Sequence, residues 1–437
     1  MDLKSELKKV ISGTLMVRVF SVSATFLTSV LLARTLGAEG FGLYSFVYAL
    51  IMLVALPCQI GIPVLLVRET AKLESEKSWS KMKGLWFWSG KTILMISALS
   101  CVTVFLFQLI KGDGDENQFL TYVFGVLLIP LISLGNCRAA ALRGLRKIVK
   151  GQLPDAVVRP GFYLIFLTAL WCADYANSAS LAMGLNVVSA IIGFIVGGYL
   201  LVASSPSQIA KVEADYSDSK KWMASSLPLA LIGGLQVLSG QTGIILLGLI
   251  HEESEAGIYK VAVSIATVMA FGLQIINMIV SPYAARFYHS GELSRLQKIA
   301  TLGAVVGMSV SIPIFLLVLL AGEDFLSMIY GAGFAMAASP LLILAFGQLV
   351  NTFFGSTGTI LNMTGNEKVA AKWFGVSAVF NVIASVILIP FYGVVGAAVA
   401  SSLSVLLWNI VFWILAKRNT GIDGSLLSLF SCVRSFK

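Results

Sequence analysis

Three cationic side chains lie inside long apolar stretches of the sequence, where a charge is energetically expensive. Arg18 lies about two turns into the first stretch, while Lys91 and Lys260 lie near the starts of the third and eighth stretches. A cation at membrane depth tends to be functional. These residues are therefore candidates for compensating the charge of an anionic ligand, Arg18 first among them. The alternative is that their long side chains only reach the membrane surface.

The composition predicts a polytopic membrane protein. Of the 437 residues, 57% are hydrophobic and only 12% are charged, whereas a soluble domain has about 25% charged residues. The mean hydropathy is +0.88. Such a chain cannot cover a soluble surface, and it is too apolar to be disordered. Continuous apolar runs also argue against a transmembrane β-barrel, whose strands alternate apolar and polar residues.

Apolar stretches long enough to cross a bilayer of about 30 Å recur along the whole chain. We predict twelve spans, of which the fifth is short. Their approximate ranges are 11–33, 42–66, 86–110, 119–141, 157–172, 181–203, 226–250, 257–281, 299–320, 335–360, 371–390 and 394–416.

The basic residues predict the orientation of these spans. With the N-terminus inside, every Lys and Arg outside the spans falls on the cytoplasmic side except Arg34 and Lys111. This bias is typical of membrane proteins and supports both the span count and two cytoplasmic termini. The net charge of +9 thus reflects the membrane topology. The basic inner loops are suited to contact with anionic lipid and not to binding nucleic acid.

A weak internal repeat divides the chain into two halves. Segment 31–60 aligns without gaps with 246–275, and both contain a Gly-x-Tyr at the start of an even-numbered span. Six spans in each half give the halves the same orientation, as in transporters built from two bundles. We therefore expect lobes at 1–203 and 226–437, joined by a cytoplasmic linker at 204–225.

Several segments resemble the polysaccharide-exporter branch of the multidrug/oligosaccharidyl-lipid/polysaccharide (MOP) superfamily. They lie in the same order along nearly the whole chain: 32-LARTLGAEGFGLYSF-46, 61-GIPVLLVRETA-71, 141-ALRGLRK-147, 247-LGLIHEESEAGIYKVA-262, 361-LNMTGNEK-368 and 389-IPFYGVVGAAVA-400. The resemblance implies an all-α, MATE-like fold of two pseudo-symmetric six-helix lobes around a central cavity. It implies a Wzx-type flippase of the bacterial inner membrane, which moves undecaprenyl-pyrophosphate-linked O-antigen units and works with a polymerase and a chain-length regulator.

For such a substrate, the cations of the spans would take the pyrophosphate, because a low-dielectric lumen must compensate its charge. Arg68, Arg138 and Arg286 cap the inner ends of spans. They could form a cytoplasmic gate that captures the headgroup, although anchoring at the membrane surface also explains them.

Amide side chains inside the spans are candidates for contacts with sugar hydroxyls. These candidates are Gln59, Gln274, Asn277, Gln348 and Asn351. The last four form two pairs at i, i+3 spacing, which places each pair on one helix face. Hydrogen bonds between packed helices are the alternative role.

Pro63 and Pro228 are candidate hinges for alternating access, because proline loosens a membrane helix. Proline is also common in membrane helices that do not move.

The sequence predicts neither an enzyme nor a cofactor. The five cysteines are scattered, and no cluster has the spacing of metal ligands. Segment 84-GLWFWSGKT-92 has the wrong spacing for an ATP-binding loop. The outer loops are short, which argues against the alternative of a polyprenyl-linked sugar polymerase or ligase.

No Asp or Glu is expected deep in a span, and Asp155 is placed at the end of one. Exporters driven by protons or sodium typically bury a carboxylate. This expectation argues against the other alternative, a MATE-like exporter of a soluble substrate. Related exopolysaccharide or teichuronic acid flippases stay open.

Overall fold

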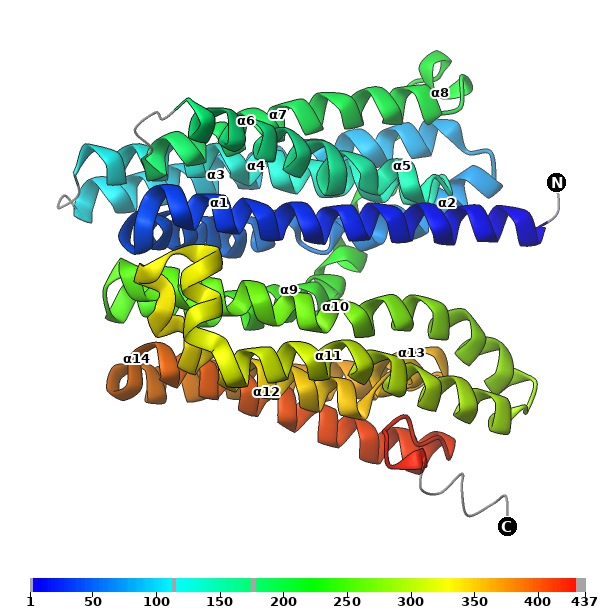
Figure 1. Ribbon diagram of the computed structural model, residues 1–437. Coiled ribbons are helices and arrows are strands. Elements are labelled where there is room, and N and C mark those ends of the chain that lie inside the picture. The colour runs from blue at the N-terminus through cyan, green and yellow to red at the C-terminus, as the bar shows by residue number, and fades with distance from the viewer. Residues whose placement is uncertain (1–2, 112–114, 174–177, 430–437) are drawn as a thin grey trace, which may run out of the picture. The chain divides into compact units, whose positions relative to one another are not determined.

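The computed structural model describes residues 3–111, 115–173 and 178–429, and in these ranges the regular secondary structure is helical throughout. The chain forms two compact units, Met1–Gln241 and Thr242–Lys437. Figure 1 shows each unit as a bundle of long helices. The all-α fold class predicted from the apolar stretches is confirmed.

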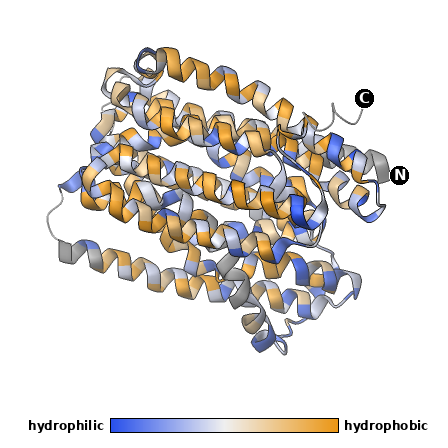
Figure 2. Cartoon of the chain, turned by 90° about the horizontal axis from the view of Figure 1, so that it is seen from below, coloured by the Kyte–Doolittle hydropathy of each residue, from blue (hydrophilic) through white to orange (hydrophobic). Residues whose placement is uncertain are grey.

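Nine helices in the described ranges are long and apolar enough to cross a membrane. Figure 2 shows apolar residues along the helices and hydrophilic residues gathered toward their ends and the loops. Large side chains such as Leu320, Phe391 and Val202 are exposed on helix surfaces, as expected for a protein whose solvent there is lipid. The protein is therefore a multi-pass membrane protein.

The N-terminal unit contains nine α-helices and one π-helix, η1, in the described ranges. Their bounds are α1 Leu3–Gln59, α2 Ile62–Ser75, α3 Trp79–Lys111, α4 Glu116–Gly144, α5 Ile148–Leu153, η1 Pro154–Val158, α6 Arg159–Cys172, α7 Ala179–Ser204, α8 Gln208–Lys211 and α9 Ser219–Ile250, of which α9 continues into the C-terminal unit.

The C-terminal unit contains the end of α9, five further α-helices and a 3-10 helix, η2. Their bounds are α10 Glu253–His289, α11 Leu293–Tyr330, η2 Ala332–Ala337, α12 Ala338–Phe354, α13 Thr357–Met363 and α14 Glu367–Thr420.

Two of the candidate spans are more than twice as long as one crossing requires. α1 contains Gly37 at φ +69°, and α14 contains Gly393 at φ +50°; neither residue has helical backbone geometry. In Figure 1 the N-terminus lies at the same end of its unit as α2, which follows α1. The chain of α1 thus turns back on itself within its length. Two crossings in each long helix would suit the expected span count, and twelve crossings stay a prediction.

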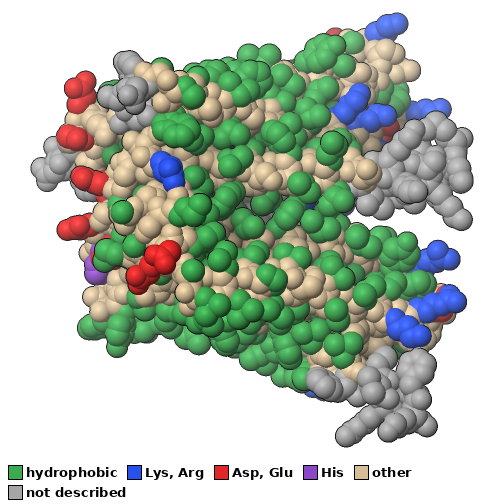
Figure 3. All heavy atoms as spheres, in the orientation of Figure 1, with side chains coloured by type: hydrophobic (Ala, Val, Ile, Leu, Met, Phe, Trp, Pro, Cys, Tyr) green, Lys and Arg blue, Asp and Glu red, His purple; other side chains and the backbone are tan. Residues whose placement is uncertain are grey.

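Charge is unevenly distributed within each unit. On the face shown in Figure 3, Asp and Glu gather at one end of the N-terminal unit and Lys and Arg at the other, and the C-terminal unit taken by itself shows the same separation. A basic end is typical of the cytoplasmic side of a membrane protein. The placement of both termini in the cytoplasm stays a prediction.

The segment that follows α7 docks onto the first turns of α3. Lys81 Nζ lies 2.7 Å from Asp218 Oδ2, and Lys83 Nζ donates to the carbonyl oxygen of Val212 at 2.7 Å. In the compact units the chain divides at Gln241, within α9, so the expected linker 204–225 falls inside the N-terminal unit. These contacts hold the segment 212–218 against α3, and the lobes 1–203 and 226–437 stay a prediction.

The segment after α14 docks into the C-terminal unit. The backbone N–H of Asp423 donates to Gln297 Oε1 at 2.8 Å, and the side-chain amide of Gln297 donates to the Asp423 carbonyl. The hydroxyls of Thr301 and Ser428 lie 2.6 Å apart. Residues 421–429 therefore fill the space beside α11 with satisfied polar groups.

Candidate functional site

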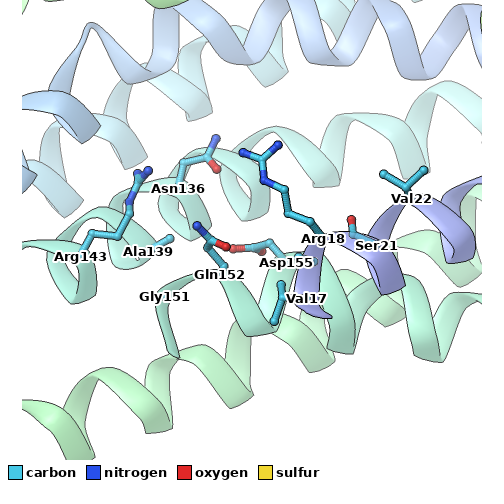
Figure 4. Close-up of a pocket in the computed structure, with 11 residues that line it drawn as sticks. Val17, Arg18, Ser21, Val22, Asn136, Ala139, Arg143, Gly151, Gln152 and Asp155 are labelled. Carbon is cyan, nitrogen blue, oxygen red and sulfur yellow. The ribbon is translucent and has the colours of Figure 1, made fainter. Parts of the chain in front are cut away.

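A cavity of about 360 Å³ opens in the N-terminal unit between α1, α4, α5 and η1, within the range of about 300–1,000 Å³ of small-molecule sites. Its polar lining includes Arg18, Asn136, Arg143, Gln152 and Asp155. Figure 4 shows Arg18, Asn136 and Arg143 pointing to the same side of the cavity, with Gln152 and Asp155 between the two arginines. We call this cavity the N-terminal pocket.

Small residues bring the helices close around the pocket. A Cβ atom on Gly151 would lie 2.9 Å from the carbonyl oxygen of Ala139, so glycine allows α5 to approach α4. Phe20, two residues beyond Arg18, packs near Gly161 of α6. Close approach at small residues is how membrane helices pack, and it holds Arg18 beside α5 and η1.

The π-helix η1 carries Asp155 into the pocket. Pro154 lacks an N–H and interrupts the helical hydrogen bonds, and the local chain forms a π-helix over Pro154–Val158. Single π-turns inside α-helices frequently occur at functional sites.

The position of Asp155 corrects an expectation from the sequence. The candidate span covers Ile148–Cys172 instead of 157–172, so Asp155 lies within it, about 10 Å from its start at 1.5 Å per residue. The basic residues that precede Asp155 resemble a cytoplasmic loop, which is why sequence reasoning began the span too late. A carboxylate is therefore present in the first third of a candidate span.

Arg138 lies behind the pocket, and its guanidinium group is bonded to other groups of the unit. Its side chain is 6% exposed, and its Nη2 atom lies 2.9 Å from Asp155 Oδ2. Nη1 donates to the carbonyl oxygens of Gly193 and Phe194 on α7 at 3.2 and 3.1 Å. A Cβ atom on Gly197 would lie 2.1 Å from Cζ of Arg138. In this conformation Arg138 is buried and bonded within the unit, and its role in a cytoplasmic gate stays a prediction.

The charges of the pocket therefore sum in favour of an anion. Arg138 and Asp155 neutralise each other, and the lining also carries two exposed arginines, Arg18 and Arg143. Arginine is suited to phosphate because its planar N–H groups match phosphate oxygens. The arrangement can bind an anionic group of about two charges.

A second network lies deeper in the same unit. Arg159 donates from Nε and Nη2 to Asn186 Oδ1 at 3.3 and 3.0 Å, and Asn186 Nδ2 donates to the Tyr44 hydroxyl at 2.7 Å. Arg159 lies inside the candidate span Ile148–Cys172, as it does in the predicted span 157–172. The network joins α6, α7 and α1, so this cation helps to hold the bundle together.

Of the amide candidates, Gln59 is linked to the pocket. Its Oε1 atom accepts from Asn136 Nδ2 at 3.1 Å, and its own amide donates to the carbonyl oxygen of Ala55. Gln59 thus orients a lining residue and does not itself line the pocket.

The other amide candidates belong to the C-terminal unit. Asn409 Nδ2 donates to Asn351 Oδ1 at 3.1 Å, and Asn351 Nδ2 donates to Gln348 Oε1 at 3.2 Å, which forms a chain of amides between α14 and α12. On α10, Gln274 is exposed, while the buried Oδ1 atom of Asn277 accepts no hydrogen bond from the described residues.

The remaining cationic candidates lie apart from the pocket. Lys91 is exposed on α3, twelve residues after its start and so deeper than expected, and Lys260 is half-buried on α10. Arg68 is exposed on α2 with Nε 3.0 Å from Glu69 Oε1, and Arg286 is exposed in the last turn of α10. Their roles in substrate binding stay predictions.

The two proline candidates differ in setting. Pro63 is the second residue of α2. It follows closely after Ile60 and Gly61, whose positive φ angles separate α1 from α2. Pro228 lies within α9, and its side chain is outside the described part of the chain. A break is present beside Pro63, and motion at either residue stays a prediction.

Sequence reasoning missed four lining residues of the pocket: Asn136, Arg143, Gln152 and Asp155. The cluster of polar residues in 136–159 could have indicated the pocket. It was instead interpreted as residues that anchor the chain at the membrane surface. Among the described residues, His, Cys, Asp and Glu form no group of three that could hold a metal ion.

The chain matches two protein-family models. Residues 7–288 match the polysaccharide biosynthesis protein family, and residues 228–387 match the MatE family.

Curated relatives match over most of their length. The probable low-salt glycan biosynthesis flippase Agl15 of Haloferax volcanii is 23% identical over 88% of this chain and 78% of its own length. The capsular polysaccharide biosynthesis protein CapF of Staphylococcus aureus is 24% identical over 75% of this chain and 81% of its own length.

Solved structures share the fold. The lipid II flippase MurJ in an inward closed conformation superposes with a TM-score of 0.74 at 13% identity, over 93% of this chain and 87% of that one. An inward-facing MATE family multidrug transporter of the MOP superfamily gives a TM-score of 0.73 at 14% identity, over 93% and 98%. The chain therefore belongs to the polysaccharide biosynthesis protein family of the MOP superfamily and has a MATE-like fold.

Proposed function

We propose that this protein is a flippase that moves lipid-linked oligosaccharides across a membrane, with the anionic headgroup bound in the N-terminal pocket. The observation that carries the proposal is the pair of exposed arginines, Arg18 and Arg143, on the lining of a cavity within apolar helices. Cations of this kind mark substrate pathways in membrane proteins. The flippase names of the relatives support the same substrate class.

A polyprenyl pyrophosphate carrier suits the pocket, because its headgroup carries about two negative charges and the lining includes the guanidinium groups of Arg18 and Arg143. We further propose, from the family resemblance, an undecaprenyl-linked surface polysaccharide unit such as O-antigen as the substrate. A cytoplasmic membrane and both termini inside are part of the proposal. A polymerase and a chain-length regulator would act on the exported unit.

A soluble-substrate exporter of the same fold is the second candidate, because the C-terminal half matches the MatE family. The absence of a carboxylate in a span no longer argues against it, since Asp155 lies in one. The pocket favours an anion over a cationic drug, because the charge of Asp155 is compensated by Arg138.

Reconstituted transport tests the proposal. The protein is placed in liposomes with a polyprenyl-pyrophosphate-linked trisaccharide that carries a fluorophore on the sugar, and dithionite reports the fraction in the outer leaflet. We expect transport by the wild type and at least a tenfold slower rate for Arg18→Ala and Arg143→Ala, since one charge-assisted phosphate contact contributes about 1.5–3 kcal/mol.

Arg146→Ala is the matched control, because Arg146 is exposed near Arg143 and does not line the pocket. Its rate should stay within twofold of the wild type. Unchanged transport in the Arg18→Ala, Arg143→Ala double variant would falsify the headgroup site.

Deletion of the gene in its host separates the classes of function. Loss of long surface polysaccharide with accumulation of lipid-linked units on the cytoplasmic side supports the flippase. Single units that still reach the surface would indicate a polymerase, and an unchanged surface polysaccharide would favour the soluble-substrate exporter.

A further inference from the structure

Asp155 has an acceptor oxygen to spare in the N-terminal pocket. Its Oδ2 atom takes the bond from Arg138, and among the described residues nothing donates to Oδ1. Gly135 of α4 lies next to this oxygen, since a Cβ atom on Gly135 would be 3.4 Å from Oδ1. Because glycine has no side chain, α4 does not cover Oδ1 at this position. An ionised carboxylate can accept about four hydrogen bonds.

The exposure of Asp155 is unusual for a group that only neutralises a buried cation. The Asp155 side chain is 42% exposed while its partner Arg138 is 6% exposed, and the carboxylate lies on the lining of the pocket beside Gln152 (Figure 4). Carboxylates inside spans are rare and usually functional. The free oxygen is therefore available to a ligand in the pocket.

The pocket combines two kinds of recognition. Arg18 and Arg143 offer only donors, which suit phosphate oxygens, and Asp155 Oδ1 offers only an acceptor. A bare diphosphate is rich in acceptors and has no sugar hydroxyl to donate to Asp155 Oδ1. A sugar attached to the diphosphate places hydroxyl donors next to the phosphate.

We propose that Asp155 accepts a hydrogen bond from a hydroxyl of the first sugar, so that the pocket selects glycosyl diphosphates over bare diphosphates. This inference rests on the proposed function and names its specificity determinant. It means that the lipid loaded with sugar is bound, and that the unloaded carrier lipid is rejected at the same site. Hydrogen bonds between O–H groups and an ionised carboxylate are short and strong.

Binding of two soluble probes tests the inference on the full chain in detergent. The probes are geranyl diphosphate and the same molecule with N-acetylglucosamine esterified to its second phosphate, and the measurement is titration calorimetry at pH 7.4. We expect the wild type to bind the sugar-bearing probe at least tenfold more tightly. A site built to bond a hydroxyl discriminates strongly against an analogue that lacks it.

Substitutions separate the sugar contact from the phosphate contact. Asp155→Asn keeps the shape and an oxygen for Arg138 but turns an NH2 group toward the ligand, and it should reduce the preference to below threefold, mainly by weaker binding of the sugar-bearing probe. Arg18→Ala should weaken both probes by a similar factor and keep the preference. If Asp155→Asn does not fold, a probe with a 2-deoxy or 3-deoxy sugar on the wild type measures the same contact.

The outcomes distinguish this inference from the proposed function. Equal binding of the two probes by the wild type, or a full preference in Asp155→Asn, overturns the role of Asp155 while the phosphate site stands. Failure of both probes to bind overturns the phosphate site and, with it, the inference.

Discussion

In the N-terminal unit an ion pair lies beside an open cavity, whereas in the C-terminal unit a chain of neutral amides joins two helices. Arg138 and Asp155 form an ion pair beside an open cavity, while Asn409, Asn351 and Gln348 bond to one another between α14 and α12. Neutral side chains satisfy each other at small cost in lipid, but charged ones need a functional reason.

The surroundings of the two networks differ as well. The N-terminal unit has a polar pocket between α1, α4 and η1, and in the C-terminal unit residues 421–429 pack beside α11. The comparison separates an ion pair next to a cavity from neutral groups that bond between packed helices.

The largest expected effect comes from breaking the ion pair of the N-terminal unit. Arg138→Ala removes the partner of Asp155 and empties the slot beside Gly197. We expect a loss of stability of about 3 kcal/mol, at the low end for a broken buried pair, because Asp155 keeps contact with the cavity. Thermal unfolding in detergent, followed by near-UV circular dichroism, measures the change.

Asn409→Ala is the counterpart in the C-terminal unit. It removes one neutral amide from the chain with Asn351, and we expect a loss of about 1–2 kcal/mol. Equal losses for Arg138→Ala and Asn409→Ala would remove the distinction between the two units.

An intermediate effect is expected where residues 421–429 dock. Gly355 has φ +62°, and a Cβ atom there would lie 2.5 Å from the carbonyl oxygen of Gly424. Gly355→Ala should lose about 1–2 kcal/mol from the positive φ and also displace the docked segment. Hydrogen–deuterium exchange should rise across residues 421–429.

Gly365→Ala is the matched control, because Gly365 has φ +82° and nothing within 4 Å of a Cβ atom. It should show the loss from the backbone alone, without faster exchange in residues 421–429. If both variants leave the exchange of that segment unchanged, the segment is not held by this contact.

A smaller effect is expected at the kinks of the two long helices. A Cβ atom on Gly393 would lie 2.7 Å from Glu255 Oε2, whereas one on Gly37 would meet nothing within 4 Å. Both alanine variants strain the backbone, since both glycines have positive φ. Gly393→Ala should therefore lower the unfolding midpoint more than Gly37→Ala, and the reverse order would contradict the packing at Gly393.

The smallest effect concerns the docked linker of the N-terminal unit. Hydrogen bonds from Lys221 and Lys81 lower the pKa of Asp218 to about 2. A carboxyl group whose pKa is lowered by folding stabilises the folded state above its ordinary pKa, about 3.9, and that contribution is lost as the pH falls toward 2. Docking should therefore not change between pH 8 and pH 5.

Hydrogen–deuterium exchange of residues 212–218, corrected for intrinsic rates, measures this docking. Asp218→Asn should loosen the segment slightly at all these pH values, because exposed ion pairs contribute little. Release of the wild-type segment between pH 8 and pH 5 would show that another group controls it.

The amino-acid sequence by itself determined the membrane class, the all-α fold and the family. Each apolar stretch is a local property of the sequence. Its length and composition favour a position in the bilayer whatever the neighbouring helices are. Family segments such as 32–46 are likewise continuous in the chain. For these reasons the fold class could be predicted without any knowledge of tertiary contacts.

Only the tertiary structure decided which polar groups meet. Asp155 faces Arg138 because η1 and α4 pack at a particular rotation, and Gln59 bonds Asn136 across α1 and α4. The sequence placed Asp155 at the end of a span and Gln59 against a sugar. Such pairings depend on the angle at which two helices pack, to which residues distant in the chain contribute, so no local pattern contains them.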